Sequence, residues 1–342
     1  MSPRPGCRPI RRLRLRPDLP NNRSLLPALL VLALSFAGTG AVAGQPETVI
    51  IDTDIGDDVD DAFAVALALA SPEMKVIGIT TAWGDTVTRA RLVGRLLRET
   101  GRCGIPVAIG APTKTDTPFT QRRWAEAYPA AATAQPQAVD FLLDQIRHDP
   151  GQITLVAIAP LTNIGAAIAR DPQTFRKLKR VVMMGGSIQR GYDGPGHAPD
   201  AEYNIRMDAA AARVLFASGV PITMMPLDST IIRLEPKPQS QFFAHGTPTT
   251  DALALLYAQW SANNSWNQHI PTLYDAVPVA ALVDPTLCPT TPARIEVDDR
   301  GFTLTVPGSA NAAICLKSNP GDLLRLITSR ILAMPVAPPC ER

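Results

Sequence analysis

A run of aspartates lies where an apolar strand is expected to pass into a helix, and it constrains the fold more than any other stretch. The aspartates are Asp52, Asp54, Asp57, Asp58, Asp60 and Asp61. The β-branched residues 49–51 predict a buried strand, Gly56 predicts a turn, and residues 63–70 predict a helix that stops at Ser71-Pro72. In an open α/β sheet, such a crossing lies at the carboxyl ends of the strands, where ligands bind.

The crowding of these acids raises a problem of charge. Carboxylates this close cannot remain ionised together unless a cation or extensive hydrogen bonding offsets their repulsion. Helix capping is an alternative role, because aspartate at a helix start accepts hydrogen bonds from free N–H groups. One or two acids suffice for a cap, so we expect a cation site. Oxygen-only ligands favour Ca²⁺ or Mg²⁺.

Strand and helix patterns alternate along the rest of the chain. Strands are predicted at 74–81, 106–110, 153–159, 179–184 and 221–227, helices at 87–100, 138–148, 164–170, 249–266, 275–282 and 322–334, and a two-stranded ribbon at 293–305. The 342 residues, 46% of them hydrophobic, suffice for one large core, and no repeat or linker interrupts the alternation. We therefore predict a single α/β domain over 44–342, with an open, mostly parallel sheet and helices on both faces.

The charge of the chain is small and unevenly distributed. A net charge of +2 gives no electrostatic reason to expect a nucleic acid polymer as a partner. Seven arginines precede the apolar run 25–37, and small residues ending at Ala43-Gly44 follow it. This pattern predicts an export signal peptide over 1–43 and a periplasmic or secreted protein with no stable membrane span after processing. A retained anchor is the alternative, and Arg11-Arg12 leave the export route open.

Four cysteines follow the predicted signal: Cys103, Cys288, Cys315 and Cys340. An even number permits disulfides in an oxidising compartment, and sequence alone does not choose among the pairings. We favour a pair within Cys288, Cys315 and Cys340 because these residues lie close together in the sequence. Their spacing matches no zinc site.

Residues 111–136 form a long segment without a regular pattern, rich in proline, threonine and alanine. A long loop in a compact domain is usually either functional or mobile. We interpret this segment either as a lid over the aspartate site or as surface decoration.

Four separated segments together resemble the inosine–uridine-preferring nucleoside hydrolases. They are Asp52-Thr53-Asp54-Ile55-Gly56 with Asp60-Asp61-Ala62, residues 155–164 (LVAIAPLTNI), Met184-Gly185-Gly186 followed by Ala201-Glu202-Tyr203-Asn204, and Asp275 before an apolar helix. An Asp-x-Asp after a strand also begins haloacid-dehalogenase-type phosphatases, but we find no convincing placement for the later lysine and acidic pair that they need. The resemblance implies Ca²⁺-dependent hydrolysis of the N-glycosidic bond of ribonucleosides by a dimer or tetramer.

The resemblance also implies roles for individual residues. Those that would hold Ca²⁺ are Asp54, Asp61, the main-chain carbonyl of Ile158 and Asp275. Those that would face the substrate are Asp60, Asp85, Glu202, Asn204 and Tyr274. Asp54, which would touch both the ion and the attacking water, is the expected general base.

Three departures from the family pattern leave details open. The aspartate loop is two residues longer than the usual Asp-Pro-Gly-x-Asp-Asp, so Asp57-Asp58 compete with Asp60-Asp61 for the paired positions. We choose Asp60-Asp61 because they abut the helix, with Asp58 in reserve. Tyr274 stands where purine-processing members often have a histidine, and a phenol is a poorer acid at neutral pH. Gly196 replaces an asparagine, which weakens any statement about the 5′ side of the sugar.

The residue types agree with the chemistry that the resemblance implies. Cleavage passes through an oxocarbenium-like cation, and carboxylates around the sugar favour that charge. Trp83, Trp260 and Trp266 are candidates for stacking on the base, with core packing as the alternative, and His269 is more typical of a surface or core residue than of an acid. We predict an exported N-glycosidase for purine or pyrimidine salvage. The alternatives are a hydrolase of another N-ribosyl compound and a periplasmic nucleoside- or ribose-binding protein.

Overall fold

The computed structural model describes residues 45–128, 135–338 and 340, so the predicted export signal lies outside the described residues. Within them, one sheet contains β1 (Glu47–Thr53), β2 (Met74–Thr81), β3 (Val107–Ile109), β4 (Ile153–Ile158), β5 (Arg180–Met184), β6 (Ile222–Met225), β7 (Thr291–Val297), β8 (Thr303–Val306) and β9 (Ala312–Ile314). The order across the sheet is β3-β2-β1-β4-β5-β6-β9-β7-β8. All pairs are parallel except β7 with β9 and β7 with β8, so the predicted open, mostly parallel sheet is confirmed.

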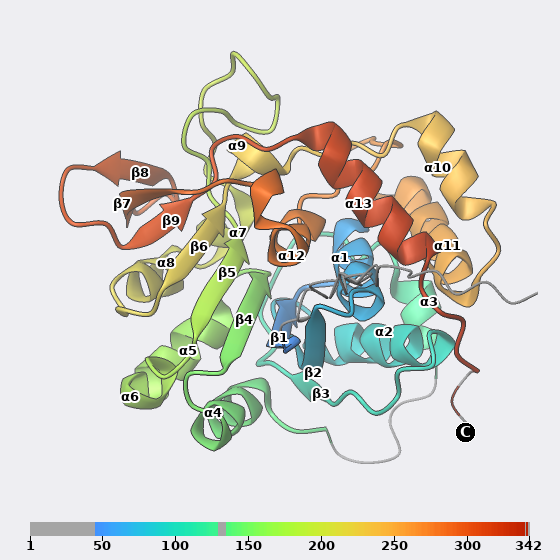
Figure 1. Ribbon diagram of the computed structural model, residues 1–342, viewed down its shortest axis with the longest axis horizontal. Coiled ribbons are helices and arrows are strands. Elements are labelled where there is room, and N and C mark those ends of the chain that lie inside the picture. The colour runs from blue at the N-terminus through green and yellow to red at the C-terminus, as the bar shows by residue number, and fades with distance from the viewer. Residues whose placement is uncertain (1–44, 129–134, 339, 341–342) are drawn as a thin grey trace, which may run out of the picture. The chain divides into compact units, whose positions relative to one another are not determined.

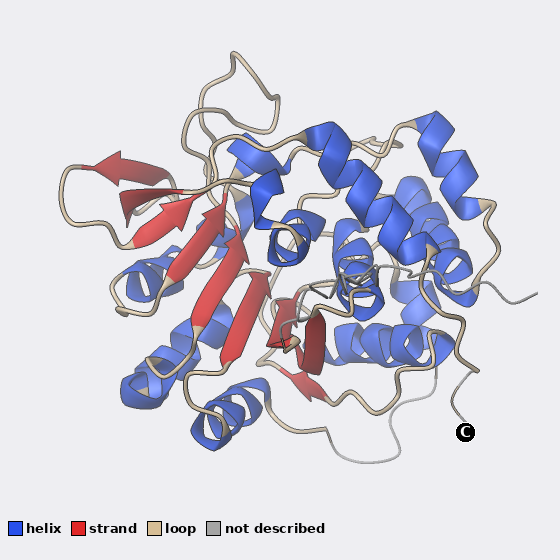
Figure 2. Ribbon diagram, viewed as in Figure 1, coloured by secondary structure: helices blue, strands red, loops and turns tan. Residues whose placement is uncertain are grey.

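Helices cover both faces of this sheet (Figure 1 and Figure 2). They are α1 (Asp60–Ala70), α2 (Thr86–Glu99), α3 (Arg122–Glu126), α4 (Ala138–His148), α5 (Thr162–Arg170), α6 (Pro172–Phe175), α7 (Tyr203–Met207), α8 (Ala209–Phe216), α9 (Leu227–Thr230), α10 (Pro236–Phe243), α11 (Pro248–Asn263), α12 (Ala276–Val283) and α13 (Pro320–Leu332). A short 3₁₀ turn, Pro285–Leu287, follows α12. The α/β architecture predicted from the alternating pattern is therefore confirmed.

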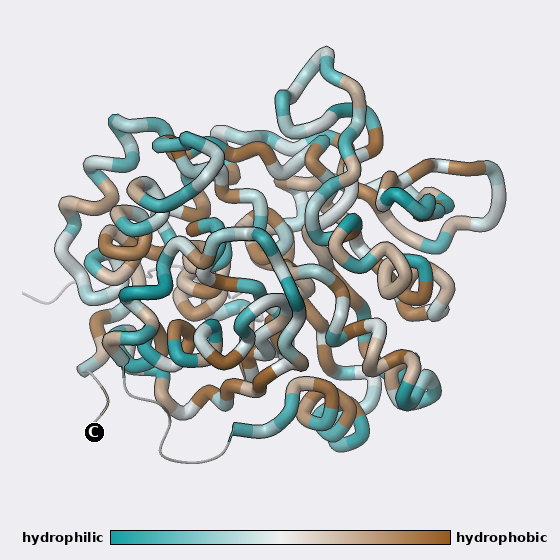
Figure 3. The backbone as a smooth tube through the Cα atoms, turned by 180° about the vertical axis from the view of Figure 1, so that it is seen from behind, coloured by the Kyte–Doolittle hydropathy of each residue, from teal (hydrophilic) through white to brown (hydrophobic). Residues whose placement is uncertain are grey.

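The alternation of side chains along β1 explains why both faces are covered. Val49 and Ile51 belong to one core cluster, which includes residues of α1, α2, α11, α12 and α13. Ile50 belongs to the other, which includes residues of α4, α5 and α8. Successive residues of a strand face opposite sides, so a continuous β-branched run needs two apolar layers. Figure 3 shows hydrophobic and hydrophilic stretches alternating along the outer helices, as expected for helices with one face against the sheet.

The strand order places a topological switch point beside β1. The chain runs from β1 outward through β2 to β3, and then returns to the other side of β1 with β4. At such a point, the connections after the two neighbouring strands leave in opposite directions and open a crevice at the carboxyl edge. Thr53 at the end of β1 lies in register with Ile158 at the end of β4. Asp54 and the carbonyl of Ile158 therefore lie at the same edge of the sheet.

Some elements differ from the sequence-based prediction. The ribbon predicted over 293–305 is the β7–β8 hairpin, but β9 was missed. Its residues Ala313 and Ile314 pair in parallel with β6, a long-range contact that local periodicity cannot show. The segment 111–136 contains the short helix α3, and the side chain of Arg89 on α2 lies in the interior.

Two disulfides join segments near the carboxyl terminus to the domain. Cys288 pairs with Cys315, which confirms the favoured choice of a pair among the last three cysteines. Cys103 pairs with Cys340 across a sequence separation of 237 residues. Among the helices of the described residues, none has the length and apolar character needed to cross a bilayer.

Candidate active site

The aspartates that begin α1 do not serve as its cap. The residue in the N-cap position is Val59, and no side-chain hydrogen bond caps the helix. Asp60 and Asp61 occupy the first turn, and both are buried. Asp275 occupies the N-cap position of α12, also without a side-chain capping bond. The capping explanation therefore does not account for these three carboxylates.

Asp60, Asp61 and Asp275 form the densest carboxylate cluster of the described residues. Each offers an oxygen, and these oxygens all lie within 4.8 Å of one another. The Asp275 N–H donates to Oδ2 of Asp60 at 3.3 Å, and the Thr53 hydroxyl donates to Oδ1 of Asp61 at 2.5 Å. Burial, followed by the charges of neighbouring aspartates, raises the pKa of Asp61 and Asp275 well above the usual range.

Asp54 lies beside this cluster, although it is not one of the three residues within 4.8 Å. Burial raises the pKa of Asp54 to about 8, and the Arg89 charge opposes that rise. Burial raises the pKa of Asp60 to about 7, and the charge of Asp54 contributes to that rise. The coupling between these acids means that the ionised cluster is costly in this buried setting.

Asp52 belongs to the frame of the site rather than to the cluster. Its Oδ1 accepts hydrogen bonds from the Thr80 hydroxyl at 2.5 Å and from the Asn163 amide at 2.8 Å. The Asn163 amide also donates to the carbonyl of Thr81 at 3.1 Å. Asn163 is the asparagine of the LVAIAPLTNI motif, so this motif ties the start of α5 to the ends of β1 and β2.

Asp57 is bound to a residue that the sequence analysis did not single out. Arg89 Nη2 donates to Oδ2 of Asp57 at 2.8 Å, and both side chains are buried. The other guanidinium nitrogens donate to the carbonyls of Asp54, Ile55 and Trp83. The structure thus brings Asp60 and Asp61, rather than Asp57, to Asp275. The sequence carried no signal that Arg89 is buried, because an arginine on a helix normally faces solvent.

The turn after β2 carries two residues considered for the substrate. Trp83 has a left-handed backbone (φ 62°), which is uncommon for a residue other than glycine. Its indole nitrogen is buried and lacks a protein partner. Asp85 caps α2 by accepting from the N–H and hydroxyl of Thr88, and it forms an ion pair with Arg122 at 3.0 Å. The Arg122 and Thr88 contacts lower the pKa of Asp85 against the effect of burial.

The described part of segment 111–136 packs directly on the aspartate loop. The Thr120 hydroxyl donates to the carbonyl of Asp57 at 2.7 Å, and the Gln121 amide donates to the carbonyl of Asp58 at 2.6 Å. The backbone of Gln121 also donates to the carbonyl of Gly56 at 3.1 Å. A cavity of about 520 Å³ lies between this segment, Asp57, Asp85 and Arg89. Segment 111–136 was interpreted either as a lid over the aspartate site or as surface decoration. These contacts fit the interpretation that places it at the aspartate site.

Glu202 and Asn204 lie at the start of α7. Oε1 of Glu202 accepts from the Asn204 N–H at 2.9 Å, and Oε2 accepts from the Gly186 N–H at 2.8 Å. Burial raises the pKa of Glu202 to about 7 in spite of these hydrogen bonds. The Asn204 amide donates to the carbonyl of Met184 at 3.2 Å. The Gly185-Gly186 pair after β5 therefore serves to bring backbone close to this carboxylate.

Tyr274 immediately precedes Asp275 and is half-buried. Burial, followed by the charges of Asp58 and Asp60, raises its pKa further above the ordinary value. Its ring lies edge-on to that of Tyr192, with centroids 6.1 Å apart. Tyr192 was not predicted, since it comes from the irregular segment after Gly186.

The remaining aromatic and histidine candidates lie in different surroundings. Trp260 is wholly buried in the apolar core, so the core-packing alternative applies to it. Trp266 is exposed. His269 is exposed as well, with Nδ1 2.9 Å from the Ser261 hydroxyl. His197, next to Gly196, lies near Asp193 on the surface.

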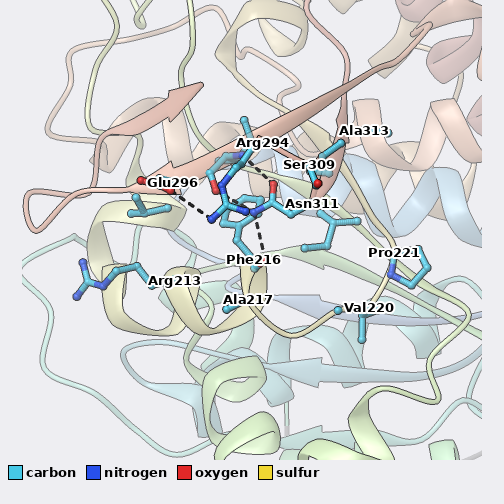
Figure 4. Close-up of a pocket in the computed structure, with 16 residues that line it drawn as sticks. Arg213, Phe216, Ala217, Val220, Pro221, Arg294, Glu296, Ser309, Asn311 and Ala313 are labelled. Carbon is cyan, nitrogen blue, oxygen red and sulfur yellow. Dashed lines mark hydrogen bonds and ion pairs between the residues drawn. The ribbon is translucent and has the colours of Figure 1, made fainter. Parts of the chain in front are cut away.

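A larger cavity of about 790 Å³ lies away from this site (Figure 4). Its walls come from α8, β7 and the amino ends of β6 and β9, including Phe216, Val220 and Asn311. The cavity therefore opens at the sheet edge opposite to the carboxylate cluster. Its charged residues already have partners, since Arg294 pairs with Glu296 and Arg213 pairs with Asp299.

The donor set at the carboxylate cluster fits a divalent cation. Three buried carboxylates meet within 4.8 Å, and the charge of Asp54 raises the pKa of each of them. Arg89 is a single buried positive charge against these acids. All of the ligand atoms are oxygens, which suits a hard cation such as Ca²⁺. The residues present can therefore hold a metal ion.

Comparison with known proteins supports the same family as the four sequence motifs. The chain matches the family described as "Inosine-uridine preferring nucleoside hydrolase" over residues 49–323. It is 32% identical over 269 residues to the pyrimidine-specific ribonucleoside hydrolase RihA of Citrobacter koseri, which covers 74% of this chain and 84% of that protein. It is 33% identical over 270 residues to RihA of an Enterobacter species, with the same coverage of both chains.

Solved structures resemble the described fold. A plant nucleoside hydrolase, PpNRh1, matches with a TM-score of 0.73 at 26% identity, covering 84% of this chain and 99% of that one. A purine-preferring ribonucleoside hydrolase from Gardnerella vaginalis matches with a TM-score of 0.71 at 28% identity and the same coverage. The resemblance inferred from the four separated motifs is confirmed. The chain belongs to the inosine–uridine-preferring nucleoside hydrolase family.

Proposed function

We propose that this ribonucleoside N-glycosidase works with Ca²⁺, and that Asp54 is its general base. Membership of the family establishes hydrolysis of the bond between base and ribose. The observation that supports the metal is the buried meeting of Asp60, Asp61 and Asp275 within 4.8 Å. A buried cluster of this kind needs a positive charge to remain ionised.

Four groups are proposed to hold the ion. They are the carboxylates of Asp54, Asp61 and Asp275 and the main-chain carbonyl of Ile158. The register of β1 with β4 supports this set, since Thr53 lies opposite Ile158. When bound, a divalent cation would lower the pKa of a water and orient it toward the sugar.

Asp54 is proposed to take the proton from the attacking water. Without a cation, burial raises the pKa of Asp54 to about 8, so that its carboxyl group is largely protonated at neutral pH and cannot act as a base. A cation beside the carboxylate favours its ionised form and so restores its capacity as a base. The surrounding carboxylates favour the oxocarbenium-like charge that develops on the ribose.

The sugar is proposed to lie between the aspartate loop and the start of α7. Asp60, Glu202 and Asn204 would bind its hydroxyls, and the buried position of all three supports this role. Asp85 reaches the sugar only if its ion pair with Arg122 opens, since Thr88 and Arg122 hold its oxygens.

Tyr274 is proposed to contact the leaving base rather than to protonate it. Its raised pKa makes the phenol an even weaker acid than usual, whereas its ring offers an apolar face. The two RihA relatives are named pyrimidine-specific and the Gardnerella vaginalis enzyme is named purine-preferring, so base preference is a matter for measurement.

Export and assembly complete the proposal. The arginine-rich amino terminus and the apolar run after it support a signal peptide over 1–43, with 44–342 as the catalytic domain. We propose a periplasmic or secreted homo-oligomer, a dimer or tetramer. Expression of the full chain in a Gram-negative host should yield a periplasmic protein that begins at Gly44. An uncleaved chain that is recovered from the membrane and identified by amino-terminal sequencing would contradict this proposal.

The decisive experiment measures ribose release by the mature chain from a panel of purine and pyrimidine nucleosides. Each reaction is run with Ca²⁺, with chelator, and after Ca²⁺ is restored. We expect release that the chelator abolishes and Ca²⁺ recovers. Release that is insensitive to chelation would contradict the metal and leave the family activity intact.

The two alternative functions give different results in the same assay. Ca²⁺-dependent nucleoside binding without ribose release would support a periplasmic binding protein, since the ligands would be present without turnover. Ribose release from other N-ribosyl compounds, with none from the panel, would support a hydrolase of a different substrate.

A further inference from the structure

The side chain of Arg89, on α2, donates hydrogen bonds to the aspartate loop and to the turn after β2. Its Nε donates to the carbonyl of Trp83 at 2.8 Å, and its Nη2 donates to the carboxylate of Asp57 at 2.8 Å. Its Nη1 donates to the carbonyl of Asp54 and, at 3.1 Å, to that of Ile55. Only 1% of the residue is exposed. All three guanidinium nitrogens are thus directed at the loop and at the adjoining turn.

The loop depends on such contacts because its own sequence is permissive. Gly56 adopts φ +124°. Glycine has little intrinsic preference for one backbone conformation, so this residue does not by itself hold the loop in its observed conformation. The next residue, Asp57, is held by Arg89, and Phe119 lies with its ring centroid 5.0 Å from the guanidinium carbon. Arg89 therefore holds the loop by hydrogen bonds on both sides of Gly56.

We propose that Arg89 is a positioning residue that directs Asp54 toward the cluster of Asp60, Asp61 and Asp275. With the carbonyls of Asp54 and Ile55 held by the guanidinium, the backbone orientation at Asp54 is set. This inference rests on the proposed function, because the cluster is taken there as the Ca²⁺ site.

Two physical effects of Arg89 act on a cation in opposite directions. Its positive charge repels a metal ion, so a purely electrostatic role would make the ion bind more tightly once the arginine is removed. Its hydrogen bonds hold the loop, so a positioning role would make the ion bind more weakly. Residues that orient metal ligands typically change metal affinity by about 10–100-fold when they are lost.

Lysine distinguishes the charge of Arg89 from its geometry. A guanidinium presents a planar fork of five donors, whereas an ammonium is a compact point charge. Arg89→Lys therefore keeps the positive charge but cannot reach three carbonyls and a carboxylate together. We expect it to resemble Arg89→Met rather than the wild type.

Arg95 provides a matched control on the same helix. Its Nη1 donates to the carbonyl of Trp124 at 2.7 Å, and its guanidinium lies 4.2 Å from the centre of the Trp124 ring. Arg95 thus makes the same kinds of contact as Arg89, but toward α3. Arg95→Met should lose stability through lost packing without a change in Ca²⁺ affinity.

The experiment compares the mature wild type with Arg89→Met, Arg89→Lys, Asp57→Asn and Arg95→Met. Calorimetric titration with Ca²⁺ measures ion affinity after chelation, and amide hydrogen exchange measures protection of residues 54–61. We expect both Arg89 variants to bind Ca²⁺ about 10–100-fold more weakly, to exchange faster in the loop and to lose kcat. Asp57→Asn, which leaves the three carbonyl contacts of Arg89 in place, should show the same changes to a smaller extent.

Several outcomes would overturn the inference. Unchanged or tighter Ca²⁺ binding by folded Arg89→Lys would do so, as would loop exchange equal to that of the wild type. If Arg89→Met does not fold, Arg89→Lys and Asp57→Asn decide by the same two measurements. A wild type that binds no Ca²⁺ would contradict the proposed function, whereas the exchange comparison would still decide whether Arg89 holds the loop.

Discussion

Asp54 combines burial with a position at the end of a central strand. Its carbonyl accepts from Arg89, while burial raises the pKa of its carboxyl group to about 8. The backbone at this position is held by β1 on one side and by the hydrogen bond from Arg89 on the other. This double constraint suits a base that must meet a water at one defined point.

Asp54→Asn should abolish turnover while the fold is retained. The amide has the same size but cannot accept a proton at neutral pH, and a positioned base contributes about 10²–10⁴-fold to rate. Steady-state kinetics of ribose release at saturating nucleoside and Ca²⁺ measures the loss in kcat.

Asp144→Asn is the control, because Asp144 is exposed on α4 and pairs only with Arg147. Its kcat should equal that of the wild type. Hydrolysis by Asp54→Asn at more than about a tenth of the wild-type rate would rule out Asp54 as the base, since even the lower end of the expected contribution is larger.

The turn between β1 and α1 is held in place by a segment distant in sequence. Gly56 has φ +124°, and a Cβ built on it would overlap the ring of Phe119. The same ring lies 5.0 Å from the guanidinium carbons of Arg89 and Arg122. The loop, α2 and segment 111–128 therefore form one packed unit around Phe119.

Gly56→Ala should destabilise the protein more than an alanine at a comparable glycine. Overlap with a packed ring costs about 1–3 kcal/mol in addition to the strain of the left-handed backbone. Urea unfolding of the mature chain measures the difference in the free energy of unfolding.

Gly151→Ala is the matched control, because Gly151 also has positive φ but no atom lies within 4 Å of a Cβ built there. The excess loss in Gly56→Ala should shrink when Phe119 is replaced by alanine in the same chain. Equal losses for the two glycine variants would show that Phe119 does not pack on the loop.

The buried carboxylates connect the site with the stability of the domain as a whole. Burial and mutual repulsion raise the pKa of Asp54 to about 8 and that of Asp60 to about 7. Both folded-state values lie above the unfolded value near 4, so these groups favour folding most at low pH. Their contribution is lost progressively as the pH rises from about 4 to the folded-state values of about 7 and 8.

Chelation should therefore expose a loss of stability on the alkaline side. In chelator, the melting temperature should fall between pH 6 and pH 9, and added Ca²⁺ should restore it. The stabilisation by Ca²⁺ should grow with pH because a metal ion and protons compete for the same carboxylates. Differential scanning calorimetry across this range makes the comparison, and Ca²⁺ stabilisation that is constant with pH would contradict it.

The sequence-based prediction succeeded where local patterns carried the information. The β-branched run at 49–51 indicated a strand with two buried faces, and the clusters on either side of the sheet contain these residues. The alternation of strands and helices predicted the mostly parallel sheet, and four short motifs indicated the family. These features depend on residue spacing of a few positions.

Only the tertiary structure showed that Arg89 is buried, that β9 exists and that Cys103 pairs with Cys340. Each depends on contacts between segments far apart in sequence, such as the 237 residues between Cys103 and Cys340. An arginine on an amphipathic helix is expected to be exposed until the tertiary structure supplies acceptors for it, here three from the aspartate loop and one from the turn after β2. The sequence by itself determined the fold class, the family and the run of aspartates after the first strand. The packing of distant segments decided which of those acids meet, because a buried charge takes its partners from the whole fold and not from its neighbours in the chain.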